Sequence, residues 1–459
     1  MKKYPFPYEA AFTVSPDIDS ANLGRLGAVH ALFCGRELIS KGSPEWQALG
    51  LTEHYPQFDE NREGISGLGF PFADSFFLVN DPTTLGMYRY RDDERRFVED
   101  EQSGENCAKL IRQWLKAGQI DTFHAFLHYQ RRQIEPVLTE FFLWCDRENV
   151  AKPRVWTNHS WASCPTGLCP KMLQPGYASR FVKIAARAVV GPLFGRKRLP
   201  LSKAFTRYEG SLPGSPYYVN DILAANGLRY VWLNRNDTHI NRIILPEFSQ
   251  NGRATILRPV TMDDGIRYWH FDRSFGQPAS MSGLNYLCDS PWGFDASCFV
   301  TEENLKQLCK SAGTCIFTTH WAHFRSIPIR SETIGRFELL RRWRDAGRIW
   351  TPSTGHLLEW TRRRTFLRIA CRRESGRLIV NIEGIDDPIF GPEAVNLDDL
   401  HGLTLLIQAP DATVTIALAG QACHPKNVHR SGNLFWLDAN GDSRPAMHAQ
   451  YNVTLENDK

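Results

Sequence analysis

The chain has 459 residues, with 54 Lys and Arg against 50 Asp and Glu, so its formal charge is only +4. A balanced charge spread along the chain excludes a general nucleic-acid coat and an acidic disordered protein. The length predicts about two or three domains with real hydrophobic cores. No apolar run reaches the roughly 18 to 20 residues of a membrane-spanning helix.

The first residues and the cysteines both indicate a reducing compartment. The basic start Met1–Pro7 is followed by no long apolar stretch, so we expect no secretory signal. Eleven cysteines are scattered through the chain without a C-x-x-C pair, which is typical of reduced thiols in a long cytosolic protein. These features predict a cytoplasmic protein.

Up to about residue 350 the chain alternates between strand-like and helix-like segments, which favours an α/β fold. Apolar runs predict strands at 10–15, 75–79, 154–157, 229–233, 255–258 and 315–319. Helical periodicity predicts helices at 105–117, 131–149, 215–226, 302–312 and 332–346.

The pattern changes after about residue 365. Short strands separated by Gly, Pro, Asn and Asp turns are predicted at 366–370, 377–382, 403–407 and 412–416. No helix intervenes, so this part reads as a small all-β sandwich. We therefore expect two domains, 1–364 and 365–459. The basic run Arg362-Arg363-Arg364 at their boundary is expected to be a solvated helix end, with phosphate or phospholipid contact as the alternative.

Three predicted strands lead to residues that can bind a metal or transfer a proton. The strand at 10–15 leads to Asp17 and Asp19, the strand at 154–157 to His159, and the strand at 315–319 to His320. In α/β barrels, functional side chains sit at the carboxyl ends of the strands. The pattern therefore predicts one site that includes these side chains.

The spacing of Asp17 and Asp19 has two interpretations. If the strand continues through Ile18, both carboxylates point to the same side. Two carboxylates so close do not both ionise freely unless a cation or a shared proton relieves them. The alternative is an Asx turn, in which Asp19 or Ser20 caps a helix that begins near Ala21.

His124 and His128 form an H-x3-H pattern. On a helix, both imidazoles would project from one face, which is half of a zinc-type site. The alternative is a pair of surface or aromatic-packed histidines. Asp121, three residues before His124, is expected to cap that helix and is given no catalytic role.

Together these motifs resemble the NodB-homology polysaccharide deacetylases (carbohydrate esterase family 4), over about residues 8–350. That family has two adjacent aspartates, and Ser or Thr after the first histidine. Here Ile18 separates the aspartates and Ala125 follows His124. The chain is most similar to a divergent D-x-D branch associated with surface-polysaccharide biosynthesis. The stretches 156–159 and 318–321 resemble the strand ends of that branch.

The resemblance implies an irregular (β/α) barrel for the first domain and a metal centre within it. Asp19, His124 and His128 would bind a divalent ion, Zn²⁺ in the first instance, with Co²⁺ or Ni²⁺ as alternatives. Because Ile18 is inserted between the two aspartates, the roles of Asp17 and Asp19 are exchangeable.

The resemblance also implies the groups that transfer protons. Asp17 would be the catalytic base and His320 the general acid. His159 would line the site or orient a partner, although a histidine held by backbone groups is the structural alternative. His323 is a reserve candidate for the acid.

These expectations predict a metal-dependent N-deacetylase that acts on an N-acetylated amino sugar of a surface polysaccharide or lipid-linked glycan. Two alternatives stay open. A glycoside hydrolase on a similar barrel would need two separated carboxylates, for example Asp17 with Asp264. A non-catalytic carbohydrate-binding or assembly protein could keep the barrel without the chemistry.

Other segments carry weaker predictions. The stretch 181–198 mixes apolar and basic residues, and is either a core helix with a basic end or an interfacial helix that contacts an anionic membrane. The Gly/Pro-rich loop 208–218 either frames a sugar site or is a plain connection. The run 263–265 predicts a tight turn. The residues after it, Arg267, Tyr268, Trp269 and Arg273, line a saccharide cleft or pack in the core.

Overall fold

The structure is a computed structural model, and it describes most of the chain. The described residues are 1–18, 21–80, 85–102, 105–158, 164–173, 208–233, 238–240, 242–275, 299–319, 328–408 and 413–439.

Five parallel strands form the first large sheet, in the order β12–β17–β18–β1–β19. Their bounds are β1 Ala10–Pro16, β12 Thr238–Ile240, β17 Arg273–Phe275, β18 Thr314–Thr319 and β19 Ile349–Trp350. All residues of β1 and β18 are buried, as expected for parallel strands that are covered on both faces.

Eight strands form the second large sheet, in the order β15–β16–β11–β10–β9–β4–β5–β6. Their bounds are β4 Asp74–Asn80, β5 Gly86–Arg91, β6 Arg96–Glu99, β9 Ile120–His124, β10 Val155–Thr157, β11 Tyr230–Trp232, β15 Arg258–Thr261 and β16 Arg267–His270. The central strands are parallel, and the edge strands β6 and β15 are antiparallel to their neighbours. The carboxyl ends of the parallel strands therefore share one edge of the sheet.

The two large sheets meet at two places. β16 ends at His270 and β17 begins at Arg273, so one segment passes from the second sheet to the first. On the other side, the Ser75 hydroxyl in β4 donates to the carbonyl of Pro16 at the end of β1, at 2.8 Å. Backbone ladders do not close the described strands into one ring. The irregular (β/α) barrel therefore stays a prediction, while a mixed arrangement of helices and sheets is observed.

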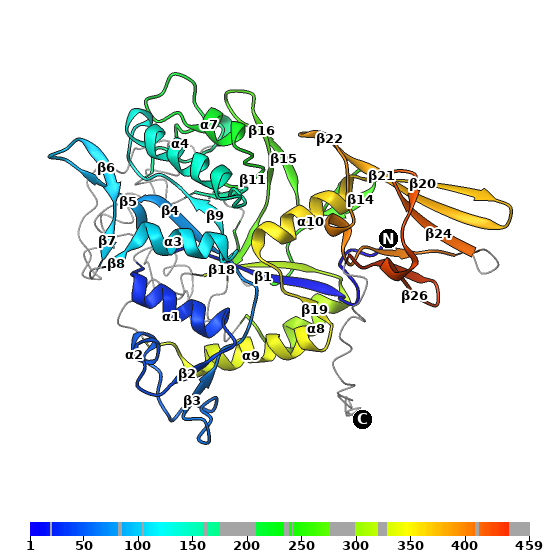
Figure 1. The fold of residues 1–459 in the computed structure, drawn as a ribbon, viewed down its shortest axis with the longest axis horizontal. Coiled ribbons are helices and arrows are strands. Elements are labelled where there is room, and N and C mark those ends of the chain that lie inside the picture. Colours follow the sequence, from blue (N-terminus) through cyan, green and yellow to red (C-terminus); the bar gives the residue numbers. More distant parts are fainter. Residues whose placement is uncertain are drawn as a thin grey trace.

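Eight α-helices accompany these sheets in the described residues. They are α1 Leu23–Phe33, α2 Pro44–Leu49, α3 Cys107–Lys116, α4 Arg131–Arg147, α7 Asn220–Ala225, α8 Glu302–Lys310, α9 Ser331–Asp345 and α10 Thr354–Phe366. α10 lies between the large sheets and the C-terminal strands (Figure 1), and it contacts β1, β9 and β21.

Small sheets make up the rest of the described structure. Three two-stranded ladders are β2 Leu38–Ser40 with β3 Gly64–Ser66, β7 Glu101–Gln102 with β8 Glu105–Asn106, and β13 Phe248–Gln250 with β14 Arg253–Thr255. Past Phe366, the described residues contain strands and short 3₁₀ turns but no α-helix.

The C-terminal part has two sheets. The larger contains β20 Leu367–Glu374, β21 Arg377–Asp387, β22 Gly391–Glu393, β24 Thr413–Leu418 and β25 Gln421–Ala422. The smaller contains β23 Thr404–Leu406, β26 Val428–Ser431 and β27 Leu434–Leu437. Val380 and Ile416 from the larger sheet share a core with Leu405 and Phe435 from the smaller one. These observations agree with a β-rich second part, and the predicted domain limits of 1–364 and 365–459 stay a prediction.

Most of the predicted elements are present. The strands expected at 10–15, 75–79, 154–157, 229–233 and 315–319 are β1, β4, β10, β11 and β18, and the helices expected at 105–117, 131–149, 302–312 and 332–346 are α3, α4, α8 and α9. Two predictions are wrong in extent. The expected strand 255–258 is interrupted between β14 and β15, and the expected helix 215–226 is confined to α7.

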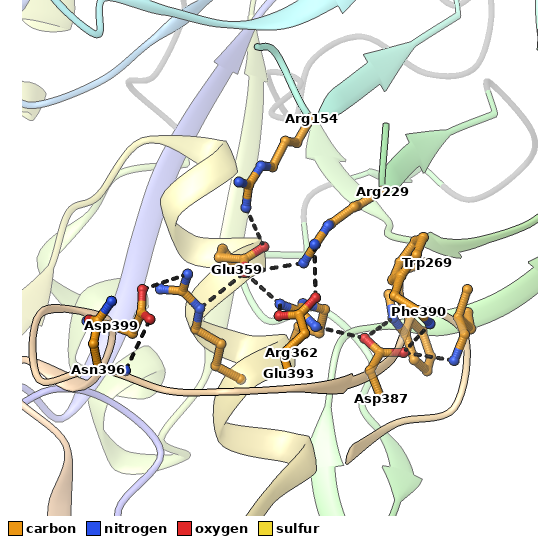
Figure 2. A network of polar contacts seen from close by, with 12 residues as sticks. Arg154, Arg229, Trp269, Glu359, Arg362, Asp387, Phe390, Glu393, Asn396 and Asp399 are labelled. Atoms are coloured by element: carbon orange, nitrogen blue, oxygen red, sulfur yellow. Dashed lines mark hydrogen bonds and ion pairs between the residues drawn. The ribbon is translucent and has the colours of Figure 1, made fainter. Parts of the chain in front are cut away.

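The basic run at the predicted boundary is not a solvated helix end. Arg362 is fully buried and Arg364 is nearly so. Figure 2 shows Arg362 donating to Glu359 on the same helix, to Asp387 at the end of β21 and to Glu393 at the end of β22, at 2.6 to 3.0 Å. The positive charge is buried because carboxylates from two parts of the chain surround it.

Candidate active site at the carboxyl ends of the strands

Asp17 lies just beyond β1 and forms a buried ion pair with Arg273, the first residue of β17. The two terminal nitrogens of Arg273 donate to the two carboxylate oxygens of Asp17, at 2.9 and 3.0 Å. Only 1% of the Arg273 side chain and 8% of the Asp17 side chain are exposed. Bidentate, charge-assisted bonds of this kind fix the plane of the carboxylate. Asp17 is therefore held in one orientation.

The Trp232 ring, at the end of β11, supports the arginine of this pair. The guanidinium carbon of Arg273 lies 3.5 Å from the centroid of the Trp232 ring, a close cation–π contact. The backbone N–H of Asp17 donates to the carbonyl of Thr319 in β18, at 2.8 Å. Three strand ends thus determine the position of the Asp17 carboxylate.

His124 is the last residue of β9 and faces the same carboxylate. Its Nε2 lies 4.0 Å from Asp17 Oδ1, and its Nδ1 lies 3.2 Å from the carbonyl oxygen of Thr157. Nδ1 also lies 3.2 Å from the hydroxyl of Thr157, which can donate to it, whereas the carbonyl oxygen can only accept from it. Thr157 therefore fixes the orientation of the ring, with Nε2 toward Asp17. A metal-binding histidine commonly has such a partner at its other ring nitrogen.

The helix expected around His124 and His128 is wrong. β9 is paired on both sides, with β4 and β10, and the chain turns directly after it. His128 is exposed in this turn, and its ring stacks on Tyr129 with 4.4 Å between the ring centroids. The buried residue Leu127 has a φ of 58°, which is uncommon outside glycine and marks local strain. The two histidines therefore come from a strand end and a strained turn.

Asp121 is not the cap of a helix around His124 but caps a distant one. Its Oδ2 accepts a hydrogen bond from the backbone N–H of Gly355, in the first turn of α10, at 2.7 Å. The hydroxyl of Thr122 donates to Oδ1 at 2.7 Å. Burial raises the pKa of the Asp121 carboxyl, and these hydrogen bonds oppose the rise. A carboxylate at this place satisfies N–H groups at the start of α10.

Several predicted site residues lie outside the described residues: Asp19, His159, His320 and the reserve acid His323. The basic stretch 181–198 also lies outside them. Their predicted roles stay predictions.

The described residues fit the predicted metal centre in part. Within the described ranges, no three His, Cys, Asp or Glu side chains come together as a metal site. His124 has the chemistry of a ligand, because Thr157 holds Nδ1 and leaves Nε2 directed toward Asp17. The complete ligand set of Asp19, His124 and His128 stays a prediction because Asp19 is not described.

Comparison with known proteins adds no relative: no protein-family model matches the chain, and no curated protein is significantly similar to it. The resemblance to NodB-homology deacetylases therefore rests on the motifs alone. Among the helices that the structure describes, none is both long enough and apolar enough to cross a bilayer.

Sequence reasoning did not find the role of Arg273. It placed Arg267, Tyr268, Trp269 and Arg273 either along a cleft or in the core, and Tyr268 and Trp269 are in fact fully buried. An arginine inside a strand-like apolar segment signals a buried carboxylate partner. The partner itself was beyond sequence reasoning, because Asp17 is 256 residues away in the chain.

The turn expected at 263–265 is confirmed between β15 and β16, with Gly265 at a φ of 84°. Asp264 accepts hydrogen bonds from the Tyr218 hydroxyl at 3.0 Å and the Asn220 amide at 2.8 Å. The carboxylate therefore ties the end of the 208–218 loop to this turn. It precedes β16, at the amino edge of the parallel strands, which does not favour its pairing with Asp17 in a glycosidase.

Proposed function

We propose that the protein is a metal-dependent N-deacetylase that acts on an N-acetylated amino sugar of a surface polysaccharide or lipid-linked glycan. The observation that supports this proposal is the approach of Asp17 and His124 at the carboxyl ends of parallel strands. The two residues belong to the two motifs that resemble the deacetylase family. We further propose a cytoplasmic location, with contact to an anionic membrane through 181–198.

In the proposed reaction, the residues of the chain orient groups and transfer protons. Arg273 holds the Asp17 carboxylate in one orientation, and an ionised carboxylate is an acceptor that can take a proton. Asp17 would take a proton from the attacking water as its oxygen bonds to the acyl carbon. His320 would give a proton to the departing amine when the carbon–nitrogen bond breaks, yielding acetate and an amino sugar.

A divalent ion would be held by Asp19, His124 and His128. When bound, it would lower the pKa of the attacking water and polarise the acyl oxygen. The role proposed for His124 is supported by the orientation of its ring, with Nδ1 at Thr157 and Nε2 toward Asp17.

Acetate release from N-acetylated glycans tests the proposal. The purified chain, loaded with Zn²⁺ or Co²⁺, should release acetate, and Asp17→Asn and His124→Ala should each reduce the rate by at least about a hundredfold, the scale of a general base. His124→Ala should also weaken metal binding. Wild-type protein that binds no metal would contradict the proposal, as would an His124→Ala variant that binds it equally well. Release of reducing ends instead of acetate would favour the glycoside hydrolase.

A further inference from the structure

Three buried donors near Asp17 have no hydrogen-bond partner among the residues that the structure describes. They are the indole nitrogen of Trp232, the hydroxyl of Thr318 and Nε of Arg273. The three residues are 6%, 5% and 1% exposed. Buried polar atoms in native proteins are almost always paired, so such atoms call for a ligand, a water or another explanation.

These three residues form one continuous group. Thr318 in β18 lies beside Ser15 in β1 in the parallel register. Arg273 donates to the Ser15 hydroxyl at 3.4 Å and lies over the Trp232 ring. Side chains that lie opposite each other in paired strands project to the same face, so Thr318 shares the face of Ser15, to which Arg273 donates. The unpaired donors are therefore grouped beside Asp17.

The chemistry of the group defines the ligand it would take. An indole N–H and a guanidinium N–H can only donate, and a hydroxyl can also donate, so the group suits oxygen acceptors. The charge of Arg273 is balanced by Asp17, so the pair presents no net positive charge to an anion. A neutral ligand rich in hydroxyl and carbonyl oxygens would supply the acceptors without needing a positive charge to bind it.

We propose that Trp232 and Thr318 are substrate-binding residues that donate hydrogen bonds to oxygens of an N-acylated, uncharged sugar held next to Asp17. This inference rests on the proposed function for the identity of the ligand. It adds two contacts to that function: Trp232, which lies outside the motifs that resemble the deacetylase family, and Thr318, which stands two residues before His320. Arg273 acts as a positioning residue, because it reaches the site through Asp17 and Trp232.

Thr319 offers a matched control on the neighbouring position. It is also buried, and its hydroxyl also lacks a partner in the described part of the chain. Alternation places it on the opposite face from Thr318, the face of Phe317, which packs in the other core. A Thr→Val substitution removes the hydroxyl at either position with little change in volume, and it leaves the backbone carbonyl of Thr319 that accepts from Asp17 in place. Only the change at Thr318 removes a donor from the group beside Asp17.

Binding of penta-N-acetylchitopentaose tests the inference, measured by titration calorimetry in EDTA so that no metal-dependent hydrolysis occurs. Thr318→Val and Trp232→Phe should each weaken binding by roughly fivefold, the value of one neutral hydrogen bond, while Thr319→Val binds like the wild type. Thermal unfolding without sugar should show no loss of stability in either valine variant, because each removes an unpaired polar group.

The outcomes separate this inference from the proposed function. If Thr318→Val and Trp232→Phe bind the sugar as tightly as the wild type, the inference is overturned whether or not acetate is released. If Thr319→Val weakens sugar binding as much as Thr318→Val does, the inference is also overturned, because the effect would then not be specific to the face of β18 that carries Thr318. If the wild type binds no acetylated sugar, the inference fails, and metal-dependent acetate release then decides the proposed function separately.

Discussion

At the scale of residues, the ion pair between Asp17 and Arg273 is the most constrained feature of the candidate site. Each partner is almost completely buried, so each charge depends on the other for its solvation. Removing one partner of a buried pair leaves the second charge unpaired, whereas removing both can cost much less. The pair should therefore behave as one unit.

A double-mutant cycle tests this coupling. Asp17→Asn and Arg273→Met should each lower the free energy of unfolding by about 3 to 5 kcal/mol, and the double variant should lose less than the sum. Urea unfolding provides the measurement. The exposed pair of Arg348 and Glu9 is the control, where Arg348→Met should cost less than about 1 kcal/mol. Additive losses at Asp17 and Arg273 would contradict the coupling.

At the scale of elements, the start of α10 depends on a carboxylate from β9. Asp121 accepts a hydrogen bond from the Gly355 N–H, and a Cβ on Gly355 would lie 2.8 Å from Asp121 Oδ2. That separation is shorter than the contacts that Cβ atoms make. Glycine is therefore required here by the neighbouring strand, although alanine is normally the better helix former.

Paired alanine substitutions test this requirement. Gly27→Ala in α1 meets no atom within 4 Å and should stabilise the protein by about 0.5 to 1 kcal/mol. Gly355→Ala should instead lower the free energy of unfolding by about 1 kcal/mol or more, because Asp121 must move and loses a hydrogen bond. Thermal denaturation of both variants measures the difference. A stabilising Gly355→Ala would show that Asp121 is not fixed at the helix start.

The elements also show what sequence reasoning can reach. The fully buried strands β1 and β18 are visible as short, uncharged and largely apolar runs, because parallel strands covered on both faces have no row of solvent-facing polar residues. The segment around His124 was misread, because an H-x3-H spacing is compatible with a helix while its pairing with β4 and β10 is a tertiary contact. Asp17 and His124 were identified as candidates, but Arg273 was not assigned to Asp17, because no local pattern records a contact between distant strands.

At the scale of the whole molecule, α10 joins the large sheets to the C-terminal strands through buried charges. Glu359 on this helix receives hydrogen bonds from Arg362 at 2.6 Å and from the Tyr230 hydroxyl in β11 at 2.7 Å. Arg229, just before β11, pairs with Glu393 of β22 at 2.8 Å. The Arg229–Glu393 pair crosses the predicted boundary at 364/365, as do the bonds from Arg362 to Asp387 and Glu393 (Figure 2).

The pH dependence of stability should report this network. Burial raises the pKa of the Glu359 carboxyl, but Arg362, Tyr230 and Arg363 outweigh it and lower the pKa from 4.5 to about 2. A lowered native pKa adds stability above the unfolded value of 4.5, and this stability is lost as the pH falls through about 2. The wild type should therefore lose about 3 kcal/mol over that window through this group.

Urea unfolding at pH 5, 4 and 3 would measure this loss of stability through Glu359. The stability difference between the wild type and Glu359→Gln should shrink steadily as the pH falls, because the variant carries no carboxylate to protonate. The exposed residue Glu383 gives the control, and its Gln variant should follow the wild-type profile. A difference that stays constant down to pH 3 would contradict the role assigned to Glu359.

The same network predicts that the two parts of the chain unfold together. Asp387 accepts from Arg362 at 3.0 Å and from the Trp269 indole at 3.1 Å, so one C-terminal carboxylate satisfies both α10 and β16. Asp387→Asn removes the negative charge and turns an acceptor into a donor, leaving the Arg362 charge partly unpaired. It should cost about 3 to 5 kcal/mol, whereas Asp386→Asn, at the exposed neighbouring position, should stay within about 0.5 kcal/mol.

Scanning calorimetry shows whether the two parts of the chain unfold in one transition or in two. Leu358 and Phe366 of α10 share a core with Val380 and Leu405 of the C-terminal sheets, so separation of these sheets would expose that core to water. It would also break the bonds from Arg362 to β21 and β22. Wild-type protein should therefore show one heat-absorption peak, and Asp387→Asn should move the whole peak to lower temperature. Two peaks, with only the second displaced by Asp387→Asn, would mean that the parts on either side of α10 fold independently.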